Sequence, residues 1–148
     1  MILSFDELKE YRHRVAMVDG AFDPLHRGHI EYFRIAAEQL DVPLLCNVAS
    51  DRYVETKHPP LLAEDDRAAV VDAIRHISYT HVNAFDTETI LRELQPKYYV
   101  KGADWRGRLP SEQVTICRTH GIDIVYLDTV LESSSRLLQE FCRKNSQR

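Results

Sequence analysis

Strand-like and helix-like segments alternate along this chain, and this alternation restricts the fold more than any other feature of the sequence. Val15–Val18 and most of Pro43–Ala49 are continuously apolar rather than apolar at every second position. Continuously apolar strands are typical of a parallel sheet that helices cover on both faces. Because strand and helix alternate five times, the sequence predicts an α/β fold: a single doubly wound, Rossmann-like domain with a five-stranded parallel sheet.

The domain is expected to fill residues 1–148, with an N-terminal helical extension over 1–13 that Ser4 caps. We expect strands at 15–18, 43–49, 79–85, 97–100 and 122–127. We expect helices from residue 30 to about 40, at 64–76, 87–94 and 111–120, and from residue 133 onward. Apolar spacing predicts that Val70, Val71, Ile74 and Ile77 face the core, as do Leu137, Leu138 and Phe141. Residues 143–148 are expected to fray, and 51–62 is a long polar loop of the kind that often carries function.

Composition excludes several classes of protein. The net charge of the 148 residues is −4, which argues against a nucleic-acid partner, and no apolar run is long enough for a membrane span. The three cysteines have neither disulfide-framework nor metal-ligand spacing, and Cys46 and Cys142 are expected to fill the core. A reducing, cytoplasmic location is expected, and no residue is assigned to a metal.

Two histidines, His26 and His29, stand where the second helix begins, directly after the first apolar strand. Gly20 permits a tight exit from that strand. The free N–H groups and positive dipole end of a helix N-terminus favour phosphate. Two imidazoles at such a place can stabilise the charge that builds on a phosphorus under attack. The pattern therefore indicates an enzyme that acts on a nucleoside triphosphate.

Two other segments also follow predicted strands, so the topology brings them to the same edge of the sheet. In Lys101-Gly102-Ala103-Asp104, the glycine allows close approach of backbone, and the carboxylate can accept hydrogen bonds from a ribose or base. Ser133, Ser134, Ser135 and Arg136 open the last helix, where hydroxyls, N–H groups and a fixed positive charge suit the outer phosphates of a triphosphate.

The G-x-F-D-x-x-H-x-G-H pattern at 20–29 resembles the signature of the cytidylyltransferase-like nucleotidyltransferases, the HxGH type of this fold. Val100–Trp105 is similar to the V-K-G-G-D-Y stretch of the heptose-phosphate adenylyltransferase domain and to the G-D-D-W stretch of glycerol-3-phosphate cytidylyltransferases. Ser133–Ser135 resembles the S-T-T of the second signature of the family. The resemblance runs from about Val15 to Phe141 with the motifs in order.

The resemblance implies that the phosphate of an acceptor attacks the α-phosphorus of ATP or CTP and that pyrophosphate leaves. It implies Mg²⁺ with the triphosphate and, since relatives are commonly dimers, a possible homodimer. The implied catalytic residues are His26, His29, Lys57 and Arg136. The implied nucleotide-binding residues are Gly20, Ala21, Phe22, Gly28, Lys101, Gly102, Asp104 and Ser133–Ser135. Asp23 and Arg67 are assigned to the acceptor, although Asp23 equally suits a turn and Arg67 could pair with Asp65 or Asp66.

The chain departs from the family pattern in its last motif. Asp128 stands where cytidylyltransferases carry Arg, and Leu131 stands where they carry Gly. An anion cannot replace the Arg contact, so the sequence favours ATP over CTP and leaves the acceptor open among sugar, polyol and other phosphomonoesters. A non-catalytic nucleotide sensor of the same fold is the alternative. A kinase-like hydrolase is disfavoured, because the chain has no G-x-x-x-x-G-K-[ST] motif.

Overall fold

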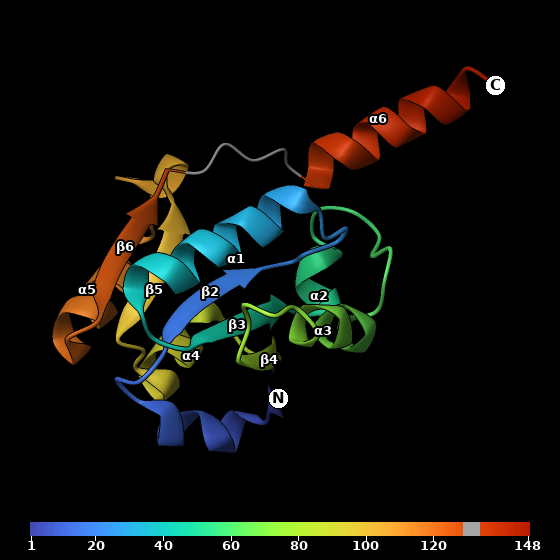
Figure 1. Ribbon diagram of the computed structural model, residues 1–148. Helices are drawn as coiled ribbons and strands as arrows, with labels where there is room; N and C mark the ends of the chain where they lie inside the picture. Colours follow the sequence, from blue (N-terminus) through green and yellow to red (C-terminus); the bar gives the residue numbers. More distant parts are fainter. Residues whose placement is uncertain (129–133) are drawn as a thin grey trace.

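The computed structural model of the protein describes residues 1–128 and 134–148, and it is built on one parallel sheet (Figure 1). The strand order is β1-β4-β3-β2-β5-β6. The five predicted strands are all present: β2 (Ala16–Gly20), β3 (Leu44–Ala49), β4 (Tyr79–Asn83), β5 (Tyr98–Gly102) and β6 (Asp123–Leu127). The sheet has six strands rather than five, because β1 (Ile2–Leu3) pairs with the edge of β4. Two residues are too few to show a strand pattern in sequence.

Helices cover both faces of the sheet, as predicted for a doubly wound domain. On one face, α1 (Arg27–Leu40) and α3 (Glu64–Asp72) bury Phe33 and Val71 against the strands. The other face is covered by η1 (Phe5–Tyr11), α4 (Thr87–Leu94) and α5 (Ser111–His120). Figure 1 shows α1 in front of the sheet, with α4 and α5 behind it. The short 3₁₀ helix η1 is the expected N-terminal helix, and its first turn is closed by the Ser4 N–H, which donates to Glu7 (2.7 Å).

The predicted long loop and the helix that follows differ from expectation. Residues 51–62 contain a short helix, α2 (Asp51–Val54), which Ser50 caps through the N–H of Tyr53. Helix α3 ends at Asp72, four residues early, and Val70 is 45% exposed although a buried position was predicted. So short a helix buries only one narrow stripe, here Ala68 and Val71, and Val70 lies beside it.

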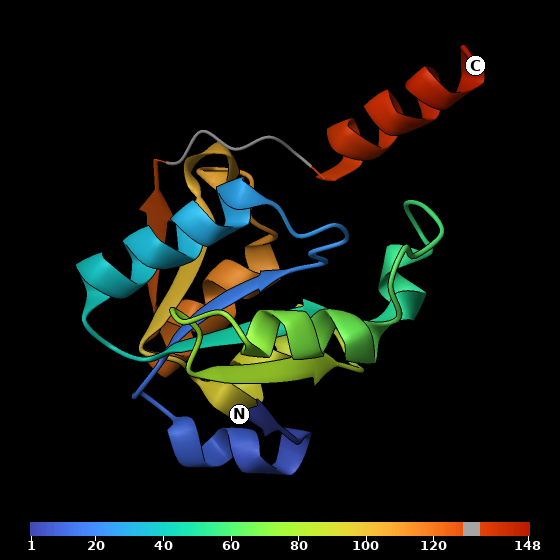
Figure 2. The same ribbon diagram turned by 45° about the vertical axis from the view of Figure 1, so that its right-hand side comes forward.

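Helix α6 (Ser134–Ser146) extends away from the body of the protein (Figure 2). The prediction that Phe141 faces the core is wrong, because this side chain is 62% exposed and no residue of α6 is buried. Cys142 is exposed as well, whereas Cys46 is buried as predicted. The helix continues past Lys144 to Ser146, through most of the tail that was expected to fray. The apolar spacing of α6 is helical, but spacing alone does not say what a helix packs against.

Within the described ranges, 1–128 and 134–148, no helix has the length and apolar character needed to cross a membrane.

Candidate functional site

The two histidines form a reciprocal cap at the start of α1. His26 is the residue that caps the helix, and its Nδ1 accepts a hydrogen bond from the N–H of Gly28 (3.0 Å). The Nδ1 of His29 accepts one from the N–H of His26 (3.2 Å). Their ring centres lie 3.9 Å apart. Because an Nδ1 that accepts a hydrogen bond holds no proton, each neutral ring carries its proton on Nε2 and is a donor there.

His29 is uncharged at neutral pH. Burial and, to a lesser extent, the neighbouring His26 together lower its pKa from 6.5 to about 4. The edge of the Phe22 ring packs against the His29 ring, with ring centres 5.0 Å apart and planes at 80°. His29 is therefore placed to donate a hydrogen bond as a neutral imidazole rather than to supply a positive charge.

The stability of the protein is expected to fall as the pH drops from 7.5 to 5. His81, on β4, also has a pKa lowered by burial to about 4. Between pH 6.5 and 4 the unfolded chain binds protons that the folded His29 and His81 do not, so acid favours unfolding. Each histidine contributes at most about 1.4 kcal/mol per pH unit. Urea unfolding across this range tests the prediction, and His29→Asn should show about half the slope of the original protein; a free energy that does not change with pH would contradict it.

The turn between β2 and α1 is shaped by Gly20 and Phe22. A Cβ at position 20 would lie 2.9 Å from the Phe22 ring, so only glycine allows this approach. Phe22 has a φ of 53°, the left-handed region that non-glycine residues rarely adopt. The buried ring also packs on Phe33 of α1. Phe22 thereby fixes the path of the chain from the strand end to the histidines.

Asp23 and Arg67, both assigned to the acceptor from sequence, are instead enclosed in the protein. Asp23 is fully buried, and its carboxylate accepts the N–H groups of Leu61 (2.8 Å) and Leu62 (3.1 Å). Arg67 is 1% exposed and pairs with Asp51 (2.8 Å), not with Asp65 or Asp66. Its guanidinium also donates to three backbone carbonyls, those of Ala21, Ala49 and Leu62. Through these bonds the two side chains hold the loops around the site.

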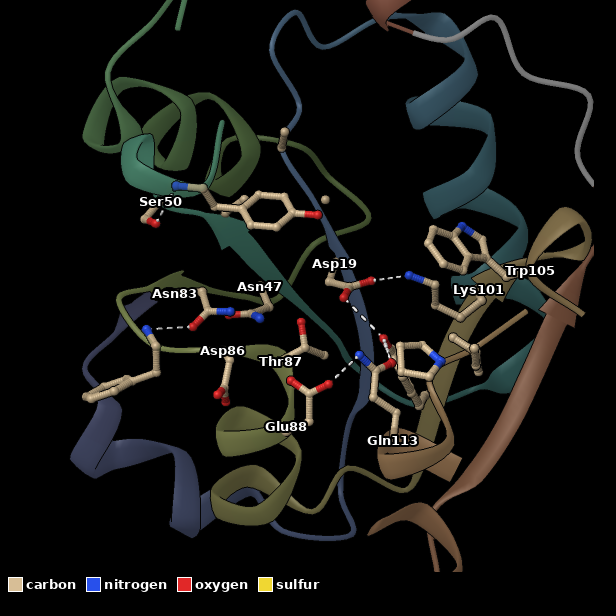
Figure 3. Close-up of a pocket in the computed structure, with 18 of the residues that line it drawn as sticks. Asp19, Asn47, Ser50, Asn83, Asp86, Thr87, Glu88, Lys101, Trp105 and Gln113 are labelled. Carbon is tan, nitrogen blue, oxygen red and sulfur yellow. Dashed lines mark hydrogen bonds and ion pairs between the residues drawn. The ribbon is translucent and has the colours of Figure 1, made fainter. Parts of the chain in front are cut away.

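A cavity of about 510 Å³ opens at the carboxyl ends of the central strands (Figure 3). Three of the predicted nucleotide-binding residues line it, Gly20, Ala21 and Lys101, together with the predicted catalytic Lys57. The ammonium of Lys57 lies 4.9 Å from the centre of the Tyr53 ring. His26 and His29 lie outside this lining, six and nine residues after Gly20. The strand end at Gly20–Ala21 therefore connects the cavity to the histidine turn.

Around the predicted Lys101, the floor of the cavity holds polar residues that the sequence analysis did not identify. The ammonium of Lys101 contacts Asp19 (2.9 Å) and lies 4.4 Å from the centre of the Trp105 ring. The hydroxyl of Tyr99 lies within hydrogen-bond distance of both Asp19 (3.2 Å) and Gln113 (3.1 Å), and the amide of Gln113 donates to Glu88 (3.1 Å). Asp19 and Asn47 are polar residues near the ends of otherwise apolar strands. A polar residue at such a position is the feature of the sequence that could have identified them as site residues.

The remaining predicted residues lie on two segments. A Cβ at Gly102 would be 2.6 Å from the Asp104 carboxylate, so glycine permits this carboxylate to fold back on the strand end. Ser133 lies outside the described residues. The hydroxyl of Ser134 donates to the carbonyl of Pro24 (2.8 Å), which joins the start of α6 to the histidine turn. Ser135 is exposed, and Arg136 contacts Glu140 (3.1 Å) on the surface of α6.

Comparison with known proteins shows which family and which relatives this chain resembles. The sequence model of the family described as cytidylyltransferase-like matches residues 17–138. The bifunctional protein HldE of Gluconobacter oxydans is 33% identical over 141 residues, which cover 87% of this chain and 28% of that protein. HldE of Campylobacter concisus is 31% identical over 115 residues, 71% of this chain and 24% of that protein. The chain thus spans about a quarter of the length of the curated relatives it matches.

Among solved structures, a similar one is the lipopolysaccharide core biosynthesis protein from Thermoplasma volcanium. It superposes with a TM-score of 0.66 at 22% identity and covers 79% of this chain and 98% of that one. At this identity the likeness shows a shared fold and nothing finer.

Proposed function

Because this chain belongs to the cytidylyltransferase-like family, we propose that it is a nucleotidyltransferase that moves a nucleoside monophosphate to a small phosphorylated acceptor. The observation that carries the proposal is the reciprocal cap of His26 and His29, in which the bonded Nδ1 atoms place both ring protons on Nε2. Two neutral N–H donors at a helix N-terminus suit a phosphate that gains negative charge.

In the proposed reaction, a phosphate oxygen of the acceptor attacks the α-phosphorus of the nucleoside triphosphate. One P–O bond forms, the bond from the α-phosphorus to the bridging oxygen breaks, and pyrophosphate leaves with the electron pair. His26 and His29 stabilise the charge on the α-phosphate oxygens, while Lys57 and Arg136 neutralise the flanking phosphates. Positioning and electrostatics supply most of the catalysis of such a transfer, since phosphates need little acid–base assistance.

Mg²⁺ is proposed to arrive with the triphosphate as part of the substrate. The carboxylates of Asp23, in the histidine turn, and Asp19, on the strand before it, do not suit a metal ion. Both oxygens of Asp23 accept backbone N–H groups, and Asp19 is paired with Lys101. We therefore assign no step to the ion and no ligand to the protein, and we expect phosphate oxygens and water to hold it.

The nucleotide is proposed to be ATP, and calorimetric titration with ATP and with CTP, each with Mg²⁺, tests this choice. Asp128 is exposed and follows the end of β6. Its negative charge repels an anionic nucleotide, so it cannot replace the arginine that contacts the nucleotide in cytidylyltransferases. We expect ATP to bind at least about tenfold more tightly than CTP, a difference of roughly 1.4 kcal/mol.

An Asp128→Arg variant is the matched control. The ratio of its affinity for ATP to its affinity for CTP should be smaller than that of the original protein. Equal or tighter binding of CTP by the original protein would overturn the choice of ATP while leaving the proposed transfer intact. Binding of neither nucleotide would count against the proposed function itself.

A further inference from the structure

One row of polar side chains crosses three neighbouring strands on a single face of the sheet. Asp19 of β2 is in register with Asn47 of β3, and Asn47 is in register with His81 of β4. Asn83 lies two residues beyond His81 on the same strand and pairs in register with Ala49. Because side chains on a strand alternate between faces, Asn47, Ala49, His81 and Asn83 share one face. The small Ala49 leaves space above the row, and the cavity occupies it.

The amide of Asn47 is held in one orientation. Its Oδ1 lies 2.9 Å from the Nδ1 of His81, a buried histidine that is neutral because burial lowers its pKa to about 4. With Nδ1–H donating to Oδ1, the Nδ2 of Asn47 faces the cavity. Asn47 is only 2% exposed, and within residues 1–128 and 134–148 its Nδ2 contacts no acceptor.

Asn83 is oriented in the same way by the backbone. Its Oδ1 accepts the N–H of Phe85 (3.0 Å), which leaves its Nδ2 without an acceptor among the residues that the structure describes. Asn83 is 8% exposed, and Figure 3 shows its amide beside that of Asn47 at the cavity wall. Because Asn47 and Asn83 both line the cavity, their two unpaired donors are open to a ligand with acceptor atoms.

Other residues that line the cavity carry acceptors instead. Asp86 and Glu88, at the start of α4, each use one carboxylate oxygen to accept a hydrogen bond, from the Thr89 N–H (2.7 Å) and the Gln113 amide (3.1 Å), whereas Asp19 is neutralised by Lys101. An ammonium group would suit these carboxylates but would leave both amides without an acceptor. A second anion would suit the amides but would be repelled by Asp86 and Glu88. A hydroxyl group both donates and accepts, so hydroxyl groups suit both the amide donors and the carboxylate acceptors of the lining.

We propose that Asn47 and Asn83 bind hydroxyl oxygens of the phosphate acceptor, and that His81 is a positioning residue that orients the Asn47 amide. The acceptor is then neutral and hydroxylated except at its phosphate, which would lie toward Lys57 and the strand end at Gly20. This inference rests on the proposed function for the identity of the ligand as an acceptor, but the cavity and its unpaired donors stand on the geometry alone.

Calorimetric binding of four probes tests the class of ligand: glycerol 3-phosphate, glucose 1-phosphate, phosphoethanolamine and 3-phosphoglycerate. We expect one of the first two, which are neutral and hydroxylated apart from the phosphate, to bind at least about tenfold more tightly than the amine and the carboxylate. Tighter binding of either charged compound, or binding of none of the four, would overturn the proposal.

The Asn47→Asp variant tests the residue role. Aspartate keeps an oxygen that accepts from His81 but replaces the donor facing the cavity by an acceptor. Binding of the preferred probe should weaken about tenfold or more, while ATP binding changes little. Glu38→Gln on the exposed surface of α1 is the control. Unchanged probe binding in Asn47→Asp would overturn the assignment.

Comparison of His81→Gln with His81→Leu tests whether His81 orients the Asn47 amide or only contributes to packing. The amide of glutamine can donate to Asn47 and leucine cannot, so only His81→Gln should retain probe affinity, and ATP affinity should remain in both. Equal loss in the two variants would assign His81 to packing. Pyrophosphate release by the original protein with ATP and the preferred probe is measured separately. If it is absent while Asn47→Asp weakens probe binding, the proposed transfer fails and the hydroxyl-binding site stands.

Discussion

Replacement of His29 by alanine is expected to lower kcat by about 10²- to 10³-fold, the usual effect of removing one donor that stabilises transition-state charge. The neutral His29 ring carries its proton on Nε2, because its Nδ1 accepts the His26 N–H at 3.2 Å. Since the role proposed for that donor is to stabilise charge that develops during the transfer, affinity for ATP should change by less than about threefold. Pyrophosphate release and calorimetric ATP binding measure the two quantities.

The alanine variant also removes a helix cap, which costs about 1 kcal/mol of folding free energy. His29→Asn separates the two effects, because an asparagine oxygen can still accept the His26 N–H while the imidazole donor is lost. Both variants should lose turnover, and only the alanine variant should lose stability. Turnover that survives in both would remove His29 from the mechanism. An original protein that binds ATP but releases no pyrophosphate would favour the nucleotide-sensor alternative.

Replacement of Arg67 by methionine is expected to destabilise the fold by about 3–5 kcal/mol, because it leaves buried polar partners without a donor. The guanidinium joins the ends of β2 and β3 through the carbonyls of Ala21 and Ala49, and it pairs with Asp51. Urea unfolding measures the loss. Lysine should restore little of it, since a single ammonium cannot reproduce the planar set of donors.

Arg52→Met provides the matched control, because Arg52 lies on the adjacent helix α2 and is exposed. It should change stability by less than about 0.5 kcal/mol. If Arg67→Met instead kept its stability and raised only the KM for the acceptor, Arg67 would belong to the binding site as the sequence analysis assigned it.

The strand–helix order and the histidine turn could be predicted because both depend on neighbours in sequence. Continuous apolar runs mark strands that are buried on both faces, and a glycine followed by closely spaced histidines marks a turn into a helix. The predictions that failed depended on contacts between distant segments. Phe141 lies on a helical stripe but on a helix that leaves the body, and Arg67 pairs with Asp51, sixteen residues away, rather than with its neighbours.

The sequence by itself determined the fold class, the place of the histidines and the family, because local periodicity and a contiguous motif are properties of one segment at a time. Only the tertiary structure decided which polar residues share the cavity. Asp19, Asn47 and His81 are separated by 28 and 34 residues, and the register of parallel strands brings them into one row. Register between strands depends on which faces of both strands are buried and on the connections between them, so no single short stretch of sequence determines it.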